Sequence, residues 1–161
     1  MSTTLKAGLL LGVLVVAWTF VMGFTGWYKD PVLLNAFWVV ILIQIGVLIR
    51  ALRKTAAEGN TYGKQVWAGT LLSTHAAIII FCGSYLFTTV AFPSYFADLR
   101  AIHEKMLLDS GMAVAEVQKT VEAQQAMQTP FFQALFGAIG TIVTGVVVSS
   151  ILGLFFKKKP A

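Results

Sequence analysis

The sequence predicts an all-α fold: an integral membrane bundle of four helices that each cross a lipid bilayer. Of the 161 residues, 57% are hydrophobic and 12% are charged, whereas soluble domains contain about 25% charged residues. So few charges cannot cover so much apolar surface in water. The apolar residues also gather into four long stretches, and about 20 apolar residues in a helix suffice to cross a bilayer. We expect residues 1–161 to form a single membrane domain.

The first two spans are expected at residues 7–27 and 32–49, joined by a short turn. Lys6 precedes the first apolar run, as a basic residue does in a signal peptide. That run is longer than a usual signal sequence and lacks a small-residue cleavage site before polar sequence, so we interpret it as a retained span, the alternative being a cleaved signal peptide. Pro31 suits the first turn of the second helix, because the first N–H groups of a helix have no partner within it.

The third and fourth spans are expected at residues 66–92 and 131–156, with the longest polar stretch, 93–129, between them. Apolar residues recur at helical spacing in both halves of this stretch. The sequence Asp109-Ser-Gly111 interrupts the pattern. The pattern of residues 93–129 therefore predicts either a helical hairpin outside the membrane or helical extensions of spans three and four. The acids Asp98, Glu104, Asp109, Glu116 and Glu122 are expected to form their solvated face.

The distribution of basic residues predicts the orientation of the spans. Eight basic residues and one acid, Glu58, fall on one side of the membrane in this arrangement, and four basic residues and six acids fall on the other. Cytoplasmic loops contain an excess of lysine and arginine, so both termini and the loop after span two are predicted to be cytoplasmic. The eight basic residues are Lys6, Arg50, Arg53, Lys54, Lys64, Lys157, Lys158 and Lys159.

The fourth span has a small residue at every fourth position, which places these residues on one nearly straight stripe of the helix. The stripe consists of Gly137, Thr141, Gly145, Ser149 and Gly153. A shorter stripe in span three consists of Gly69, Ser73 and Ala77. Small side chains let helix backbones approach closely, and such packing drives helix association in lipid. We predict that the two stripes pack together, the alternative being contact between subunits.

Three polar residues inside the spans are candidates for a polar path: His75, Gln44 and Thr74. Ionisable groups within a membrane often mark transport pathways or ligand sites. The alternative is a neutral imidazole that hydrogen-bonds to a neighbouring helix, for instance to Gln44, and holds the helices together. The single cysteine, Cys82, can form no disulfide within the chain, and we expect it to be buried and inert.

No pattern in the chain indicates catalysis. The predicted spans contain no Asp or Glu, and His103 followed by Glu104 does not form a zinc-binding HExxH motif. No Ser–His–Asp order, phosphate-binding glycine loop or paired catalytic carboxylates stand out, so we expect no metal, no cofactor and no enzyme activity. The net charge is +5. The basic residues cluster beside the apolar spans rather than along one soluble face, which argues against nucleic-acid binding.

The second half of the chain resembles a bacterial family of membrane proteins, domain-of-unknown-function family forty-one ninety-nine. The similar segments are Thr61-Tyr-Gly-Lys-Gln65, Phe92-Pro-Ser-Tyr-Phe96 and Met127-Gln-Thr-Pro130, with a Lys- and Glu-bearing helical stretch before the last of them and a small-residue final span ending in lysines. The resemblance covers roughly residues 62–159 and, by the number of spans, the whole chain. It implies a four-span protein of the bacterial inner membrane with no assigned activity, and no catalytic residues can be carried over from it.

Three classes of function remain. The first is a non-enzymatic membrane protein that binds a lipid or a protein partner, as a scaffold or an accessory subunit. The second is a small oligomeric transporter or channel with His75, Gln44 and Thr74 near its path. A membrane enzyme comes last. The expected partners are the lipid bilayer and either a second copy of the chain or another membrane protein.

Overall fold

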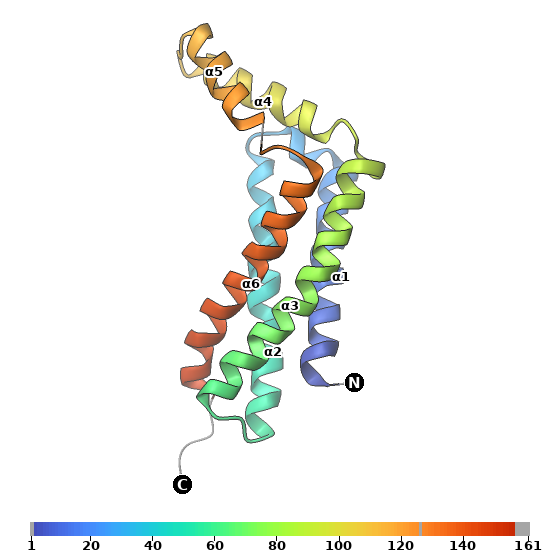
Figure 1. Ribbon diagram of the computed structural model, residues 1–161, viewed down its shortest axis with the longest axis vertical. Helices are drawn as coiled ribbons and strands as arrows, with labels where there is room; N and C mark the ends of the chain where they lie inside the picture. The colour runs from blue at the N-terminus through green and yellow to red at the C-terminus, as the bar shows by residue number, and fades with distance from the viewer. Residues whose placement is uncertain (1, 126, 157–161) are drawn as a thin grey trace.

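The computed structural model describes residues 2–125 and 127–156, and most of these residues are helical (Figure 1). Four helical segments are long and apolar enough to cross a membrane, which confirms the all-α class and the four apolar helices. They are α1 (Thr3–Thr25), a 3₁₀ helix (Leu33–Trp38) continued by α2 (Val39–Ala57), α3 (Tyr62–Leu86) continued by a π-helical turn (Phe87–Ala91), and α6 (Pro130–Phe155).

Two of these helices extend beyond the predicted spans at the connection between α2 and α3. α2 runs on to Ala57 and α3 begins at Tyr62, so Arg50, Arg53 and Lys54 lie on a helix rather than in a loop. Alanine, leucine, arginine and lysine all favour helix, and a helix can continue past the apolar stretch that hydropathy detects. Gly59, with φ of 88°, closes the short turn. Lys157, Lys158 and Lys159 lie outside the described residues.

α3 is the central helix of the bundle. It has its most extensive contacts with α6 and the next most extensive with α1, while α2 packs against α1, α6 and α3. The buried core joins apolar side chains from α1, α2 and α3: Leu11, Val15, Leu48, Ala51, Leu72, Ala76 and Ile80. Cys82 on α3, which we expected to be buried, is exposed instead, because no neighbouring helix covers its position.

Glycines bring α1 and α3 close together. A Cβ atom added to Gly12 of α1 would lie 2.7 Å from the Cβ of Ile79, and one added to Gly83 of α3 would lie 2.8 Å from a methyl carbon of Val16. Real Cβ atoms essentially never approach other atoms so closely. Each helix thus supplies glycine where the other supplies a β-branched side chain, and the interlocking lets the backbones approach.

Two further helices lie at the end of the bundle farthest from the N-terminus (Figure 1). α4 (Tyr95–Asp109) and α5 (Val114–Gln125) contact each other and are joined by a turn at Gly111, where φ is 85°. Positive φ favours glycine over other residues, so Gly111 allows the chain to reverse there. Val117 and Val121 of α5 are buried. We call this the α4–α5 end of the bundle.

Candidate functional site

A cavity of about 370 Å³ lies among α1, α2, α3 and α6 on the side of the α4–α5 end. Its walls are mainly apolar, and the side chains of Tyr28 and Tyr95 also line it. Small residues of α6 make room for it: Gly137, Gly140, Thr141 and Thr144. None of the described residues that line it has a charged side chain. The remaining polar lining residues are Thr19, Gln44, Ser84, Thr88 and Gln133.

Gln44 of α2 is one of the deeply buried polar residues of this cavity, with only 5% of its surface exposed. Its Nε2 donates to the backbone carbonyl of Thr141 over 2.7 Å and to Oγ of Ser73 over 3.4 Å. Three helices are therefore joined at one amide group. A buried hydrogen bond of this kind between membrane helices contributes about 0.6 kcal/mol on average.

The other two residues of the predicted polar path lie elsewhere. His75 packs against α1, since a Cβ added to Gly8 would be 2.7 Å from the His75 Cβ. Its Nδ1 is fully buried and has no hydrogen-bond partner among the described residues. Gln44 bonds to Thr141 and Ser73 instead of to His75. Thr74 donates to the carbonyl of Thr70 in its own helix. Successive helix residues are about 100° apart, so His75 faces away from Ser73 and from Gln44.

The small-residue stripe of α6 divides into two parts. The part nearer the C-terminus of α6 contacts α3: Gly145 lies against Ser73, Ser149 lies against Gly69, and Gly153 lies beside Tyr62 and Gln65. A Cβ added to Gly69 would be 2.7 Å from Oγ of Ser149.

The remaining part of the stripe, Gly137 and Thr141, lines the cavity. Ala77 of α3 is buried, with 3% of its surface exposed. The four-residue spacing identifies small side chains but cannot show which of them pack on α3 and which line a cavity.

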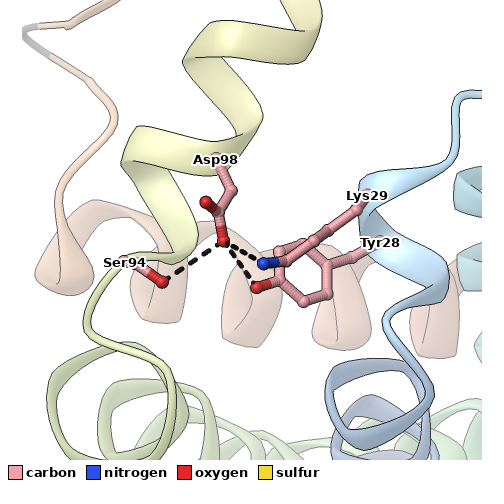
Figure 2. A network of polar contacts seen from close by, with 4 residues as sticks. All are labelled: Tyr28, Lys29, Ser94 and Asp98. Carbon is pink, nitrogen blue, oxygen red and sulfur yellow. Dashed lines mark hydrogen bonds and ion pairs between the residues drawn. The ribbon is translucent and has the colours of Figure 1, made fainter.

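A polar network links the segment between α1 and α2 to the start of α4, and all its contacts meet at Oδ2 of Asp98 (Figure 2). The Tyr28 hydroxyl donates to it over 2.8 Å, Ser94 Oγ donates over 3.2 Å, and Lys29 Nζ lies 3.0 Å away. Tyr28 belongs to a 3₁₀ turn, Trp27–Lys29, and is 4% exposed. Asp98 was predicted to lie on a solvated face, but pairing with this turn leaves 26% of its side chain exposed.

The charges of this Asp98 network follow from its contacts. Hydrogen bonds from Tyr28 and then Lys29 hold the pKa of the Asp98 carboxyl below its usual value. Burial, followed by the neighbouring Asp98, raises the pKa of the Tyr28 hydroxyl. Burial also raises the pKa of Tyr95 to about 12. At neutral pH the carboxylate is therefore charged, and both phenols beside the cavity keep their protons.

Acidification should loosen the attachment of α4. A carboxyl whose pKa is lowered by folding stabilises the folded state above its unfolded-state value, here about 3.8, and that contribution is lost as the pH falls through the folded-state pKa. We expect the melting temperature, followed by circular dichroism in mild detergent, to depend little on Asp98 between pH 6 and pH 5 and to fall as the pH is lowered below about 4. In Asp98→Asn the fall should be smaller by a few degrees, since partly exposed ion pairs contribute little.

Asp109→Asn is the matched control, because Asp109 is an exposed acid at the end of the same helix. It should retain the full pH dependence of the unsubstituted protein. Equal pH dependence in Asp98→Asn and Asp109→Asn would show that the Asp98 network does not stabilise the fold.

Within the described part of the chain, no group of three or more His, Cys, Asp or Glu side chains could hold a metal ion. A family model described as "Protein of unknown function (DUF4199)" matches residues 6–158. Comparison with curated proteins and with solved structures returned no match. The cavity and the Asp98 network are the features that the sequence did not indicate, because both depend on contacts between distant segments.

Proposed function

The chain belongs to the DUF4199 family of proteins of unknown function, and we propose that it is a multi-pass membrane protein that binds a lipid in the cavity among α1, α2, α3 and α6. The cavity itself is the main support for this proposal. Its volume of about 370 Å³ lies within the range of about 300–1,000 Å³ that is usual for small-molecule sites. Its mainly apolar walls with a few placed polar groups are also typical of such sites.

We further propose binding rather than catalysis. Acid–base and nucleophilic mechanisms require titratable or activated side chains within reach of the reacting atoms. The described lining residues offer hydroxyl and amide groups but no carboxylate, imidazole, amine or thiol. His75 and Thr74 are not among the lining residues, which gives the transport alternative less support than lipid binding. A scaffold or accessory role, alone or with a second copy or another membrane protein, is compatible with a lipid-binding subunit.

For location we propose the bacterial inner membrane, with both termini in the cytoplasm and α4 and α5 outside. The positive-inside rule supports this orientation, because Arg50, Arg53 and Lys54 lie at the end of α2 opposite to α4 and α5. The cavity would then lie in the outer half of the membrane. Trp27 and Tyr28, in the turn after α1, would lie near the outer surface, where aromatic residues are enriched.

Cysteine labelling in intact cells checks this orientation. Ser110 is exposed in the turn between α4 and α5, and Cys82→Ser removes the natural thiol. A membrane-impermeant maleimide should label Ser110→Cys in that background without opening the cells. As a control, Thr61→Cys in the turn between α2 and α3 should be labelled only after lysis. The reverse pattern would invert the proposed orientation.

Filling the cavity should abolish lipid retention while leaving the fold intact. A Cβ on Gly140 would meet no atom within 4 Å, and Gly140 lines the cavity, so phenylalanine there should occupy the ligand's space. We expect the unsubstituted protein, but not Gly140→Phe, to retain lipid in native mass spectrometry from mild detergent.

The matched control is Gly46→Phe on α2, which likewise meets no atom within 4 Å but is not among the residues lining the cavity. It should retain lipid as the unsubstituted protein does. Retention in both variants would show that the lipid is bound elsewhere, and the proposed site would be wrong.

A further inference from the structure

We infer that the cavity selects an uncharged lipid with a hydroxyl group, which donates a hydrogen bond to Oε1 of Gln44. This inference rests on the proposed function and specifies its ligand. The chemical class is a neutral lipid alcohol, in contrast to a phospholipid with a charged headgroup or a plain hydrocarbon chain. Three features of the cavity support it: the orientation of the Gln44 amide, the hydrogen bonds of the lining threonines, and the absence of charge among the described lining residues.

The orientation of the Gln44 amide is fixed by its neighbour. The backbone carbonyl of Thr141 can only accept a hydrogen bond, so the amide atom 2.7 Å from it must be the nitrogen. Oε1 is then the other amide atom, and it accepts no bond from any residue in the described ranges. Within those ranges, the one side-chain N or O atom that is both fully buried and without a hydrogen-bond partner is Nδ1 of His75. Because Oε1 of Gln44 also has no partner there, it is not fully buried. The Gln44 oxygen is therefore accessible from the cavity that Gln44 lines.

Three of the threonine hydroxyls around the cavity also present acceptors. Thr19, Thr88 and Thr141 donate their hydroxyl hydrogens to backbone carbonyls of their own helices, over 3.0, 3.1 and 2.8 Å. A hydroxyl has one hydrogen and two lone pairs, so each of these oxygens retains only accepting capacity. A ligand hydroxyl can therefore donate to these oxygens as well as to Oε1 of Gln44.

The depth of Gln44 disfavours a charged headgroup. With helical rises of about 1.5–2.0 Å per residue, Gln44 lies roughly 15–20 Å along the helix from Leu33, which is near the middle of a hydrocarbon layer about 30 Å thick. A charge at that depth needs a partner, and the described lining offers none. A plain alkyl chain would instead leave the buried Gln44 oxygen without a donor, which is unfavourable.

Competition between one labelled lipid alcohol and three unlabelled compounds with the same dodecyl chain tests the inference. The protein is placed in phosphatidylcholine nanodiscs with a diazirine-bearing dodecanol, and cross-linked residues are located by mass spectrometry. Unlabelled dodecan-1-ol, its methyl ether and dodecyl phosphate are then added as competitors. The ether keeps the oxygen but loses the donor, so we expect it to compete about tenfold less well than the alcohol. Dodecyl phosphate should also be weaker than the alcohol.

Variants separate this inference from the proposed function. Cross-linking at the cavity should disappear in Gly140→Phe and persist in Gly46→Phe. If Gly140→Phe blocks cross-linking but the alcohol and its ether compete equally, the cavity binds lipid and the inferred hydrogen bond is wrong. Stronger competition by dodecyl phosphate would also overturn the inference. If neither glycine variant changes the cross-linking, the lipid site itself is wrong.

Gln44→Leu provides a second readout. It replaces the amide, including Oε1, with an apolar side chain of similar size. The alcohol and the ether should then compete about equally. A retained preference in this variant would overturn the role of Gln44. Should Gln44→Leu fail to fold, the comparison of alcohol and ether on the unsubstituted protein still decides the inference.

Discussion

Replacing Gly145 with leucine should prevent α6 from packing on α3 and leave the protein without a stable bundle. A single Cβ atom at Gly145 would already overlap Oγ and Cβ of Ser73. Both residues are buried, and Ser73 is 0% exposed, so neither helix can yield without a backbone shift. Overpacking by one methyl group typically costs about 1–3 kcal/mol. We therefore expect Gly145→Ala to lower the free energy of unfolding by that amount, and Gly145→Leu to lower it further.

SDS-induced unfolding from mild detergent micelles, followed by circular dichroism, measures this effect. Gly140→Ala is the matched control, because Gly140 lies on the same helix with open space around its Cβ position. Alanine favours helix over glycine by about 1 kcal/mol in soluble hosts, so this variant should unfold no more easily than the unsubstituted protein. If Gly145→Ala and Gly140→Ala unfolded at the same SDS fraction, the contact between α3 and α6 would not stabilise the bundle.

Gln65→Glu should be the second most damaging change. Gln65 is 0% exposed, and its Nε2 donates to the backbone carbonyls of Leu52 and Phe156. Its Oε1 accepts from the Thr55 hydroxyl over 2.6 Å. A carboxylate would place a second oxygen against two carbonyl oxygens in a buried site. We expect the free energy of unfolding to fall by about 3 kcal/mol or more, since buried groups that lose their partners are costly.

The same SDS unfolding assay applies here. The control is Gln125→Glu on α5, which makes the same chemical change at an exposed position and should alter the free energy of unfolding by less than about 0.5 kcal/mol. Gln65→Leu should fall between these two variants, because it leaves the carbonyls unpaired without adding a charge. Equal stability of Gln65→Glu and Gln125→Glu would show that the buried Gln65 bonds are dispensable.

The apolar helices could be predicted because hydropathy and length are properties of a single segment. The ends of those helices could not be predicted in this way, since α2 continues through Arg50 and Lys54, beyond the apolar stretch that hydropathy detects. The four-residue spacing alone identifies Gly145 as a candidate for close packing. The structure then places it against Ser73.

The candidate site could be predicted only in part. Gln44 and His75 look alike in the sequence, as polar residues within predicted apolar spans. The rotation of each helix about its own axis separates them, because it turns Gln44 toward Ser73 and Thr141 and turns His75 toward Gly8. The bond between Tyr28 and Asp98 joins residues 70 positions apart, and no local pattern predicts such a pairing.

The close contacts on both sides of α3 have a consequence for changes in chain length. Gly83 meets Val16 of α1, and Gly69 meets Ser149 of α6, so the helix is held at one rotational setting by two neighbours. Inserting or deleting one residue between these glycines would turn one contact about 100° away from its partner while the other stayed in place. α3 therefore has a fixed length in this architecture, whereas the exposed turn at Gly111 can accept added residues.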